Sequence, residues 1–194
     1  NRVVTLRDTW GAKPVENQNK GRSRGRGAST DDKKPQGGGG GQPVEDVRRV
    51  AFRAATILEA GPHPEADSLL VCKVDCGDVS QEGNPEPRTV VAGLAGKIAI
   101  EDLVGKKIVA VTNLKPAKVR GIESTAMLLA ASDGGDGDAE KVELLNVPDE
   151  VQNGELLNIE GKDPSEPDPM MKSKGAIKAF DRVKAALRAN DSGE

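Results

Sequence analysis

Short apolar runs separated by turn residues fill the middle of the chain, from residue 46 to residue 162. Apolar runs of about four to eight residues between clusters of Gly, Pro, Asp and Ser are typical of a small all-β barrel or sandwich. The pattern predicts strands near 50–59, 69–76, 88–93, 107–112 and 126–131, with shorter ones near 141–146 and 155–159. The polar stretches between them, among them "GPHPEAD" (61–67), "VSQEGNPEP" (79–87) and "SDGGDGDAE" (132–140), are predicted connections.

One connection has helical rather than turn spacing. "AGKIAIEDLVG" (95–105) places Ile100, Leu103 and Val104 on one helical face, opposite two carboxylates. Three strands, a short helix and two further strands is the order of elements in the OB-fold. That fold binds ligands on strands 2 and 3 and on the loops between strands 1–2 and 4–5. We therefore predict an all-β protein with short helices, an OB-fold five-stranded barrel.

The two ends of the chain have different compositions from the middle. Residues 1–45 are polar and glycine-rich, with nine cations and five anions, and contain "GRSRGRG" (21–27) and "QGGGGGQ" (36–42). Such a segment cannot bury enough apolar surface to order itself, so we predict a flexible linker. Its Arg-Gly repeats either contact RNA loosely or serve only as a solubilising tether. Because the first residue is Asn and no signal peptide follows, we expect a trimmed or excised chain.

Residues 163–194 begin with the extended stretch "DPSEPDP" (163–169) and continue into "GAIKAFDRVKAALRAN" (175–190), an amphipathic helix pattern. The predicted apolar stripe of this helix is Ile177, Phe180, Val183, Ala186 and Leu187. We expect the helix to dock on the barrel, and a contact with a partner or a second copy is the alternative.

Composition and cysteine spacing bound the class of protein. Hydrophobic residues make up 36% of the chain and aromatic ones 2%, which fits a domain with an unfolded appendage, and no apolar run approaches the ~20 residues of a membrane span. Cys72 and Cys76 share a strand face with Leu70 and Val74, so we predict buried free thiols and a reducing compartment. With a single histidine, His63, the chain has too few ligands for a zinc site, and no cofactor motif is present.

Charge singles out one loop. Residues 46–162 hold 13 cations and 20 anions, so the barrel as a whole should repel a polyanion. Between Leu103 and Ile122, however, there are five cations and no carboxylate, and "NLKPAKVRGIES" (113–124), which overlaps this window, is the predicted strand 4–5 loop. The cations are Lys106, Lys107, Lys115, Lys118 and Arg120. A local nucleic-acid-binding surface explains this cluster better than a solvated loop does.

Each residue type in the loop suits a task in RNA binding. Lys115 and Lys118 suit phosphate oxygens as mobile point charges, and Arg120 offers a planar fork to phosphate or to a base edge. Asn113 can donate and accept as a base edge requires, and Arg88 at the start of strand 3 could extend the cationic surface. With few aromatics for stacking, recognition should depend on backbone shape.

These residues resemble a known family. "VAFRAATILEAGPHPEAD" (50–67), "RTVVAGL" (88–94) and "NLKPAKVRGIESTAM" (113–127) are similar to the tRNA-binding domain of the endothelial monocyte-activating polypeptide II type. That domain occurs in free-standing tRNA-binding proteins and is appended to methionyl- and tyrosyl-tRNA synthetases. The likeness covers about residues 46–160, with Val119 where the family usually has Met. Long members continue into a second small barrel, so this chain is either cut or pairs through its helix.

The resemblance implies a cytoplasmic, non-catalytic module that binds tRNA with little sequence preference and holds it for an aminoacyl-tRNA synthetase, in cis or in trans; an organellar location stays open. It implies no catalytic residue, cofactor or metal. The implied RNA-binding residues are Arg88, Asn113, Lys115, Lys118, Arg120, Ser124 and Met127. His63 and Asp67 in "HPEAD" are expected to hold their turn. The alternatives are an assembly module of a multi-synthetase complex, including a homodimer, or a released cytokine-like fragment.

Overall fold

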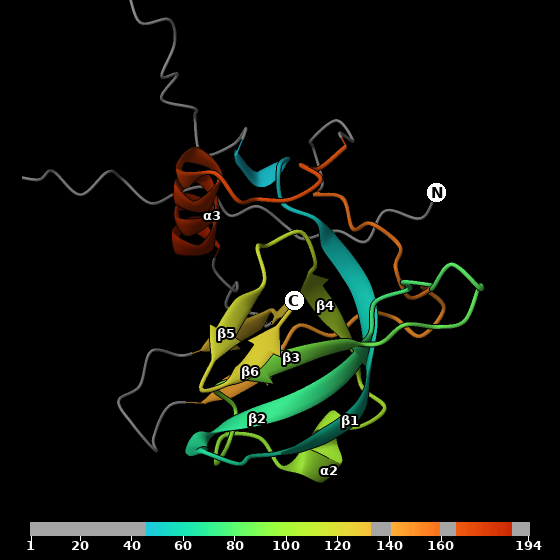
Figure 1. Cartoon of the computed structure of the whole chain (residues 1–194), viewed down its shortest axis with the longest axis vertical. Coiled ribbons are helices and arrows are strands. Elements are labelled where there is room, and N and C mark those ends of the chain that lie inside the picture. The colour runs from blue at the N-terminus through green and yellow to red at the C-terminus, as the bar shows by residue number, and fades with distance from the viewer. Residues whose placement is uncertain (1–45, 133–140, 160–165, 188–194) are drawn as a thin grey trace, which may run out of the picture.

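The computed structural model describes residues 46–132, 141–159 and 166–187, so the predicted linker (1–45) and most of the predicted hairpin tip (132–140) lie outside the described residues. The described chain is mostly β, with few helices (Figure 1). Its main sheet is antiparallel, in the order β3-β2-β1-β4-β7. These strands are β1 (Phe52–His63), β2 (Ala66–Asp75), β3 (Arg88–Ala92), β4 (Lys107–Val111) and β7 (Met127–Leu128).

Two small hairpins and the helices α2 and α3 are further elements of the described chain. One hairpin is β5 (Ala117–Val119) with β6 (Ile122–Ser124), and the other is β8 (Ala130–Ser132) with β9 (Val142–Leu144). The helices are α2 (Ile100–Leu103) and α3 (Lys174–Ala186). The predicted order of three strands, a short helix and a fourth strand is confirmed. The predicted strand near 155–159 is not formed, because Leu156 makes only an isolated bridge to Arg53.

The predicted five-stranded barrel is confirmed only in part, because the main sheet is open at β3 and β7. Strand β7 is only two residues long, and the chain just before it pairs within the β5–β6 hairpin instead. Across the opening, Thr125 N donates to Thr89 O (2.9 Å) and Val91 N donates to the Ser124 hydroxyl (3.1 Å). The second of these bonds uses a side chain where a ladder would use a carbonyl, so the sheet curls without closing.

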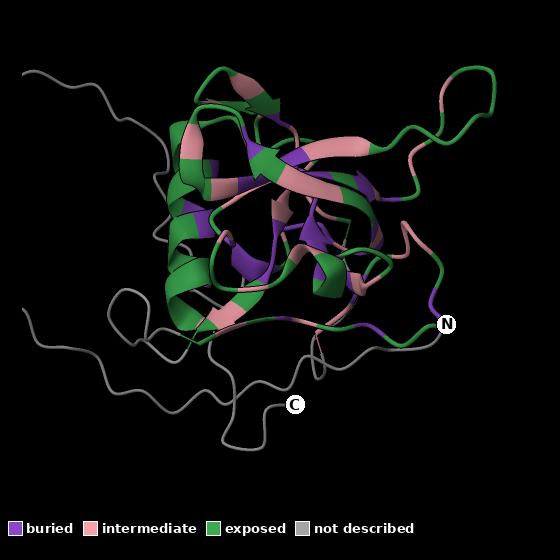
Figure 2. Cartoon of the chain, turned by 90° about the horizontal axis from the view of Figure 1, so that it is seen from below, coloured by how far each residue is buried: buried purple, intermediate pink, exposed green. Residues whose placement is uncertain are grey.

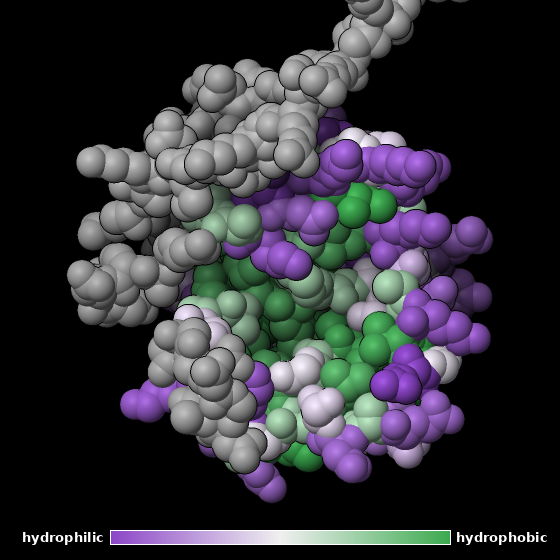
Figure 3. All heavy atoms as spheres, turned by 90° about the vertical axis from the view of Figure 1, so that its left-hand side faces the viewer, coloured by the Kyte–Doolittle hydropathy of each residue, from purple (hydrophilic) through white to green (hydrophobic). Residues whose placement is uncertain are grey.

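Strands β1 and β4 separate two apolar cores. Phe52 and Val111 point into a core that α3 covers, whereas Ile57 and Ile108 point into the core enclosed by the curled sheet. Because successive strand residues face opposite sides, β4 is apolar on both faces from Ile108 to Val111, and Phe52–Ile57 of β1 is interrupted only by Arg53 and Thr56. Figure 2 shows the buried residues between α3 and the sheet. Viewed from the left of Figure 1, an apolar area of the described surface is bordered by hydrophilic residues (Figure 3).

Helix α3 docks on the sheet as predicted, and Phe180 and Val183 of the predicted stripe are buried, but Ile177 is not. Its buried residues are Ala176, Ala179, Phe180 and Val183, whereas Ile177 is 45% exposed. Alanines let the helix axis approach the sheet more closely than a stripe of larger side chains would. The Ser173 hydroxyl accepts from Ala176 N (3.1 Å) and caps the first turn.

The prediction of buried free thiols is confirmed. Cys72 and Cys76 are free and fully buried, on the same face as Leu70 and Val74. Burial raises the pKa of both thiols, that of Cys76 to about 12. The two side chains therefore act as small apolar core residues at neutral pH.

Candidate nucleic-acid interface

The predicted strand 4–5 loop is itself a hairpin. Strands β5 and β6 pair in the register Lys118↔Glu123 and Val119↔Ile122, which leaves a two-residue turn. Both turn residues have positive φ, 44° at Arg120 and 89° at Gly121. This is the geometry of the type I′ turn, whose twist matches that of paired strands, and glycine adopts it without strain.

The cations of this hairpin are free to bind a ligand. Lys115, Lys118 and Arg120 are all exposed, and none of them has a hydrogen-bond or ion-pair partner within the described residues. Two carboxylates lie near them: Glu123 is opposite Lys118, and Glu65 Oε2 is 3.9 Å from where a Cβ on Gly121 would lie. The hairpin therefore presents three unpaired cations over a small acidic border.

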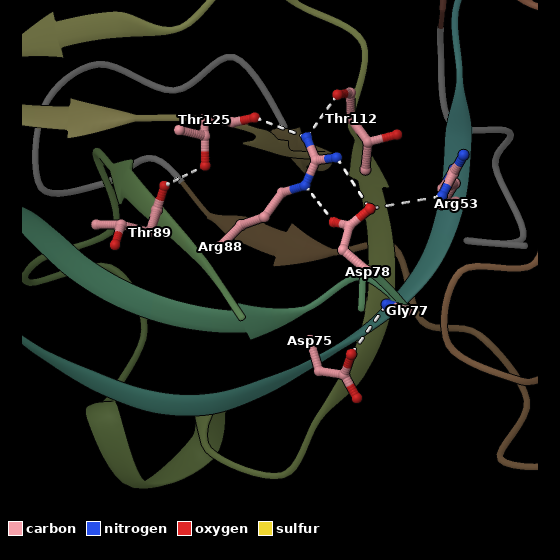
Figure 4. A network of polar contacts seen from close by, with 8 residues as sticks. All are labelled: Arg53, Asp75, Gly77, Asp78, Arg88, Thr89, Thr112 and Thr125. Atoms are coloured by element: carbon pink, nitrogen blue, oxygen red, sulfur yellow. Dashed lines mark hydrogen bonds and ion pairs between the residues drawn. The ribbon is translucent and has the colours of Figure 1, made fainter. Parts of the chain in front are cut away.

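Arg88 holds the base of the hairpin (Figure 4). Its Nη1 donates to the carbonyl of Thr112 (2.6 Å), where the chain enters the hairpin, and to that of Thr125 (3.0 Å), where it leaves. Its Nε and Nη2 donate to the Asp78 carboxylate (2.5 and 3.2 Å), and this hydrogen bonding raises the pKa of Arg88. Only 25% of the side chain is exposed. The guanidinium is therefore occupied by the protein itself.

Asn113 is likewise occupied. The side chain is buried, its Oδ1 accepts from Ala51 N (2.9 Å), and its Nδ2 donates to the carbonyls of Arg49 (2.7 Å) and Asp168 (2.8 Å). The Asn113 carbonyl accepts from Met171 N (2.7 Å). This residue therefore fastens the start of the hairpin to the segments before β1 and before α3.

The two remaining predicted site residues lie at the exit of the hairpin. The Ser124 hydroxyl is buried, accepts from Val91 N and donates to the Ala126 carbonyl (3.0 Å). Met127 is half-buried and packs against the core beneath α3. Of the seven predicted residues, the structure thus brings together three exposed cations and four residues at the base.

The β1–β2 turn touches the hairpin through His63. This buried side chain accepts from Glu65 N at Nδ1 (3.0 Å), and its Nε2 lies 3.4 Å from the Val119 carbonyl. The prediction that His63 holds its turn is confirmed, while exposed Asp67 makes no such contact among the described residues. No local sequence pattern indicates the approach to Val119, because the two residues are 56 positions apart.

Arg53 and Asp78 are base residues that sequence reasoning missed. Asp78 lies between two arginines, bound closely by Arg88 and 3.9 Å from Arg53 Nη1. Arg53 Nε is buried and has no hydrogen-bond partner in the described part of the chain. The one signal in the sequence was the position of Asp78 beside a predicted connection, which does not distinguish an ion pair from a solvated loop.

Other chemistries have little support in the described ranges. Within 46–132, 141–159 and 166–187, no group of three or more His, Cys, Asp or Glu side chains could hold a metal ion. No helix in these ranges is long and apolar enough to cross a membrane.

Comparison with known proteins identifies relatives. A family model described as "Putative tRNA binding domain" matches residues 52–156. The chain is 39% identical over 143 residues to cytoplasmic tyrosine–tRNA ligase of Gallus gallus, covering 74% of this chain and 25% of the ligase. It is 34% identical over 183 residues to a probable methionine–tRNA ligase of Oryza sativa subsp. japonica, covering 92% and 21%. The chain thus spans about a quarter of the length of these ligases.

Two solved structures are also similar. The C-terminal domain of Plasmodium vivax p43 superposes with a TM-score of 0.57 at 30% identity, over 65% of this chain and 70% of that domain. A MetRS related protein from Pyrococcus horikoshii superposes with a TM-score of 0.50 at 35% identity, over 59% and 94%.

Proposed function

Because the chain belongs to the tRNA-binding domain family, we propose that it is a non-catalytic module that binds tRNA through the β5–β6 hairpin. The curled, open sheet is in this view a variant of the OB-fold, with the hairpin as its strand 4–5 loop. The observation that carries the proposal is the trio of exposed cations, without partners in the described part of the chain, on a hairpin that is fastened at both ends.

The three cations divide the work by their chemistry. Lys115 and Lys118 bind phosphate oxygens as point charges, and Arg120 at the turn offers a bidentate fork. The fixed base of the hairpin lowers the entropy lost when RNA orders these side chains. The acidic remainder of the domain repels RNA, which confines binding to this surface.

The four other predicted residues act mainly by position. Arg88, Asn113 and Ser124 bond to the protein backbone around the hairpin and set where its cations lie. Half-buried Met127 is the one of the four with apolar surface left to offer a base. Direct RNA contacts by these four residues stay predictions.

We further propose that the module retains tRNA for an aminoacyl-tRNA synthetase in the cytoplasm. The match covers only 25% and 21% of the two ligases, which fits an appendage acting in cis, while action in trans as a separate protein is equally compatible. The assembly and homodimer alternative has less support, because the apolar face of α3 packs on the sheet and leaves only Ile177 and Ala186 of the predicted stripe exposed.

A charge reversal tests the proposal. We expect the triple variant Lys115→Glu, Lys118→Glu, Arg120→Glu to lose tRNA affinity and to flatten the dependence of log affinity on log salt by about 0.7–0.9 for each phosphate that is no longer neutralised. A control with Lys97→Glu, Lys141→Glu and Lys184→Glu makes the same change in net charge on exposed lysines outside the hairpin. Equal decreases in affinity for the two variants, or none for the first, would refute the site.

A further inference from the structure

The segment that leads into α3 lies beside the start of the hairpin. Met171 forms a parallel bridge with Leu114, and Met171 N donates to the Asn113 carbonyl (2.7 Å). Met171 itself is fully buried, so this join is part of the core. Figure 1 shows α3 next to the connection between β4 and β5. The residue after Leu114 and the residue after Met171 are both lysines, Lys115 and Lys172.

The bridge brings together two acid-free, cationic stretches. Residues 103–122 contain five cations and no carboxylate, and residues 169–180 contain three lysines and no carboxylate. The three lysines, Lys172, Lys174 and Lys178, are exposed and unpaired within the part of the chain that the structure describes. In an acidic protein, the fold has thus placed side by side two stretches that repel each other electrostatically.

Fold stability does not explain these lysines. The start of a helix favours carboxylates and disfavours cations, yet α3 has no acidic residue in its first turn. The Ser173 hydroxyl caps the first turn, and this cap needs no lysine. Each lysine near the hairpin also adds repulsion, which a bound anion such as a phosphate would relieve.

We propose that the RNA surface continues from the hairpin across Lys172, Lys174 and Lys178, where it holds a second stretch of phosphate backbone. Lys174 and Lys178 are one helical turn apart, about 6 Å along the axis, and share a face. A nucleic acid strand carries one phosphate per ~3.4 Å of axis, so the two side chains reach neighbouring phosphates. This inference rests on the proposed function, since it extends the same site.

Alanine substitutions separate the two surfaces. We compare the triple variant Lys172→Ala, Lys174→Ala, Lys178→Ala with the triple variant Lys115→Ala, Lys118→Ala, Arg120→Ala, measuring tRNA affinity between about 50 and 200 mM salt. Alanine favours helix, so the first variant keeps α3 folded. We expect its log–log salt slope to fall by about 0.7–0.9 for each phosphate that a lysine no longer neutralises. Over this salt range, the affinity of the unmodified chain should therefore fall by a factor that is up to about 40 times larger than the factor for this variant.

A matched pair on one helix provides the control. Lys174→Ala should weaken binding, while Lys184→Ala, ten residues further along α3, should leave affinity and slope as in the unmodified chain. Equal effects of the two would mean general charge attraction and would overturn the extension. A weakened hairpin variant beside an unchanged helix variant would also overturn it but leave the proposed function standing. Failure of the unmodified chain to bind tRNA would overturn both.

Discussion

The base and the tip of the β5–β6 hairpin differ in the burial and the bonding of their side chains. At the base, Arg88, Asn113 and Ser124 are largely buried, and their polar atoms bond to the backbone at distances of 2.6–3.1 Å. At the tip, Lys118 and Arg120 are exposed and unpaired among the described residues. Residues that resemble one binding motif therefore divide into a buried scaffold and an exposed cationic surface, the proposed contact surface for RNA. The scaffold should govern the free energy of unfolding, and the exposed surface should govern how tRNA affinity depends on salt.

Arg88→Ala should have the largest effect and tests the scaffold. It removes the main cation of Asp78 and leaves the carbonyls of Thr112 and Thr125 without their donor. Because a quarter of the side chain is exposed, we expect the free energy of unfolding to fall by about 3 kcal/mol, at the low end for a buried ion pair. Urea denaturation measures this change.

Two controls accompany it. Arg88→Lys should restore only part of the stability, because an ammonium lacks the planar fork. Arg53→Ala, at the longer 3.9 Å contact to the same carboxylate, should cost less than about 1 kcal/mol. A normal stability of Arg88→Ala with a flatter salt slope for tRNA would show instead that Arg88 contacts RNA.

Asn113→Ala should have the next largest effect and lower the free energy of unfolding by about 2 kcal/mol. It leaves the amide of Ala51 and two carbonyls without their partners. Hydrogen exchange gives a specific readout: the Ala51 and Met171 amides should lose protection while amides of the β2–β3 ladder keep theirs. A decrease in tRNA affinity with full protection at Ala51 would contradict the scaffold role.

Gly121→Ala tests the turn between the two regions. A Cβ would meet nothing closer than 3.9 Å, so the cost is that of holding φ at 89°, about 1 kcal/mol. Gly83→Ala is the matched control, with φ at 81° and open space in the β2–β3 connection. We expect similar decreases in stability by calorimetry, but weaker tRNA binding only for Gly121→Ala. Equal affinities would mean that the turn does not position the tip.

Lys118→Ala should have the smallest effect on folding, within about 0.5 kcal/mol, because the side chain is exposed and unpaired among the described residues. It should nevertheless flatten the salt slope for tRNA by about 0.7–0.9. Lys97→Ala, an exposed lysine before α2, should leave the slope unchanged. A normal slope for Lys118→Ala would remove this residue from the contact surface.

Sequence periodicity predicted the strands well, because a short apolar run favours a strand whichever segment that strand pairs with. The five-stranded barrel was confirmed only in part, because closing the sheet depends on one short strand, β7, and periodicity does not determine which strand the preceding residues pair with. The β5–β6 hairpin was missed because its turn has Arg120 where Asn or Asp is the usual signal. The stripe of α3 was misplaced at Ile177, since a hydrophobic pattern does not show that small alanines permit closer packing.

For the candidate site, residue type and charge predicted which cations are exposed at the tip, but not the bonds that the base residues make. The exposure of a lysine in a polar loop does not depend on distant residues, so the local sequence is enough to predict it. The partners of Asn113, by contrast, lie 55 to 64 positions away, so no local pattern shows whether its amide faces RNA or the protein backbone. The same holds for Arg88, whose partners range from 10 to 37 positions away.

The position of β1 between two cores sets an order of folding. Its second half pairs with β2 through a short turn, a local contact that forms early. Its first half is bonded to residues that are synthesised much later. Gly154 N donates to the Ala54 carbonyl (2.8 Å), and Leu157 N donates to the Phe52 carbonyl (2.9 Å). During synthesis, the β1–β2–β3 meander should therefore leave the ribosome with Phe52 still uncovered. Its hydrophobic surface is protected only after α3 emerges, which makes this interval the one in which the nascent chain is most exposed to aggregation.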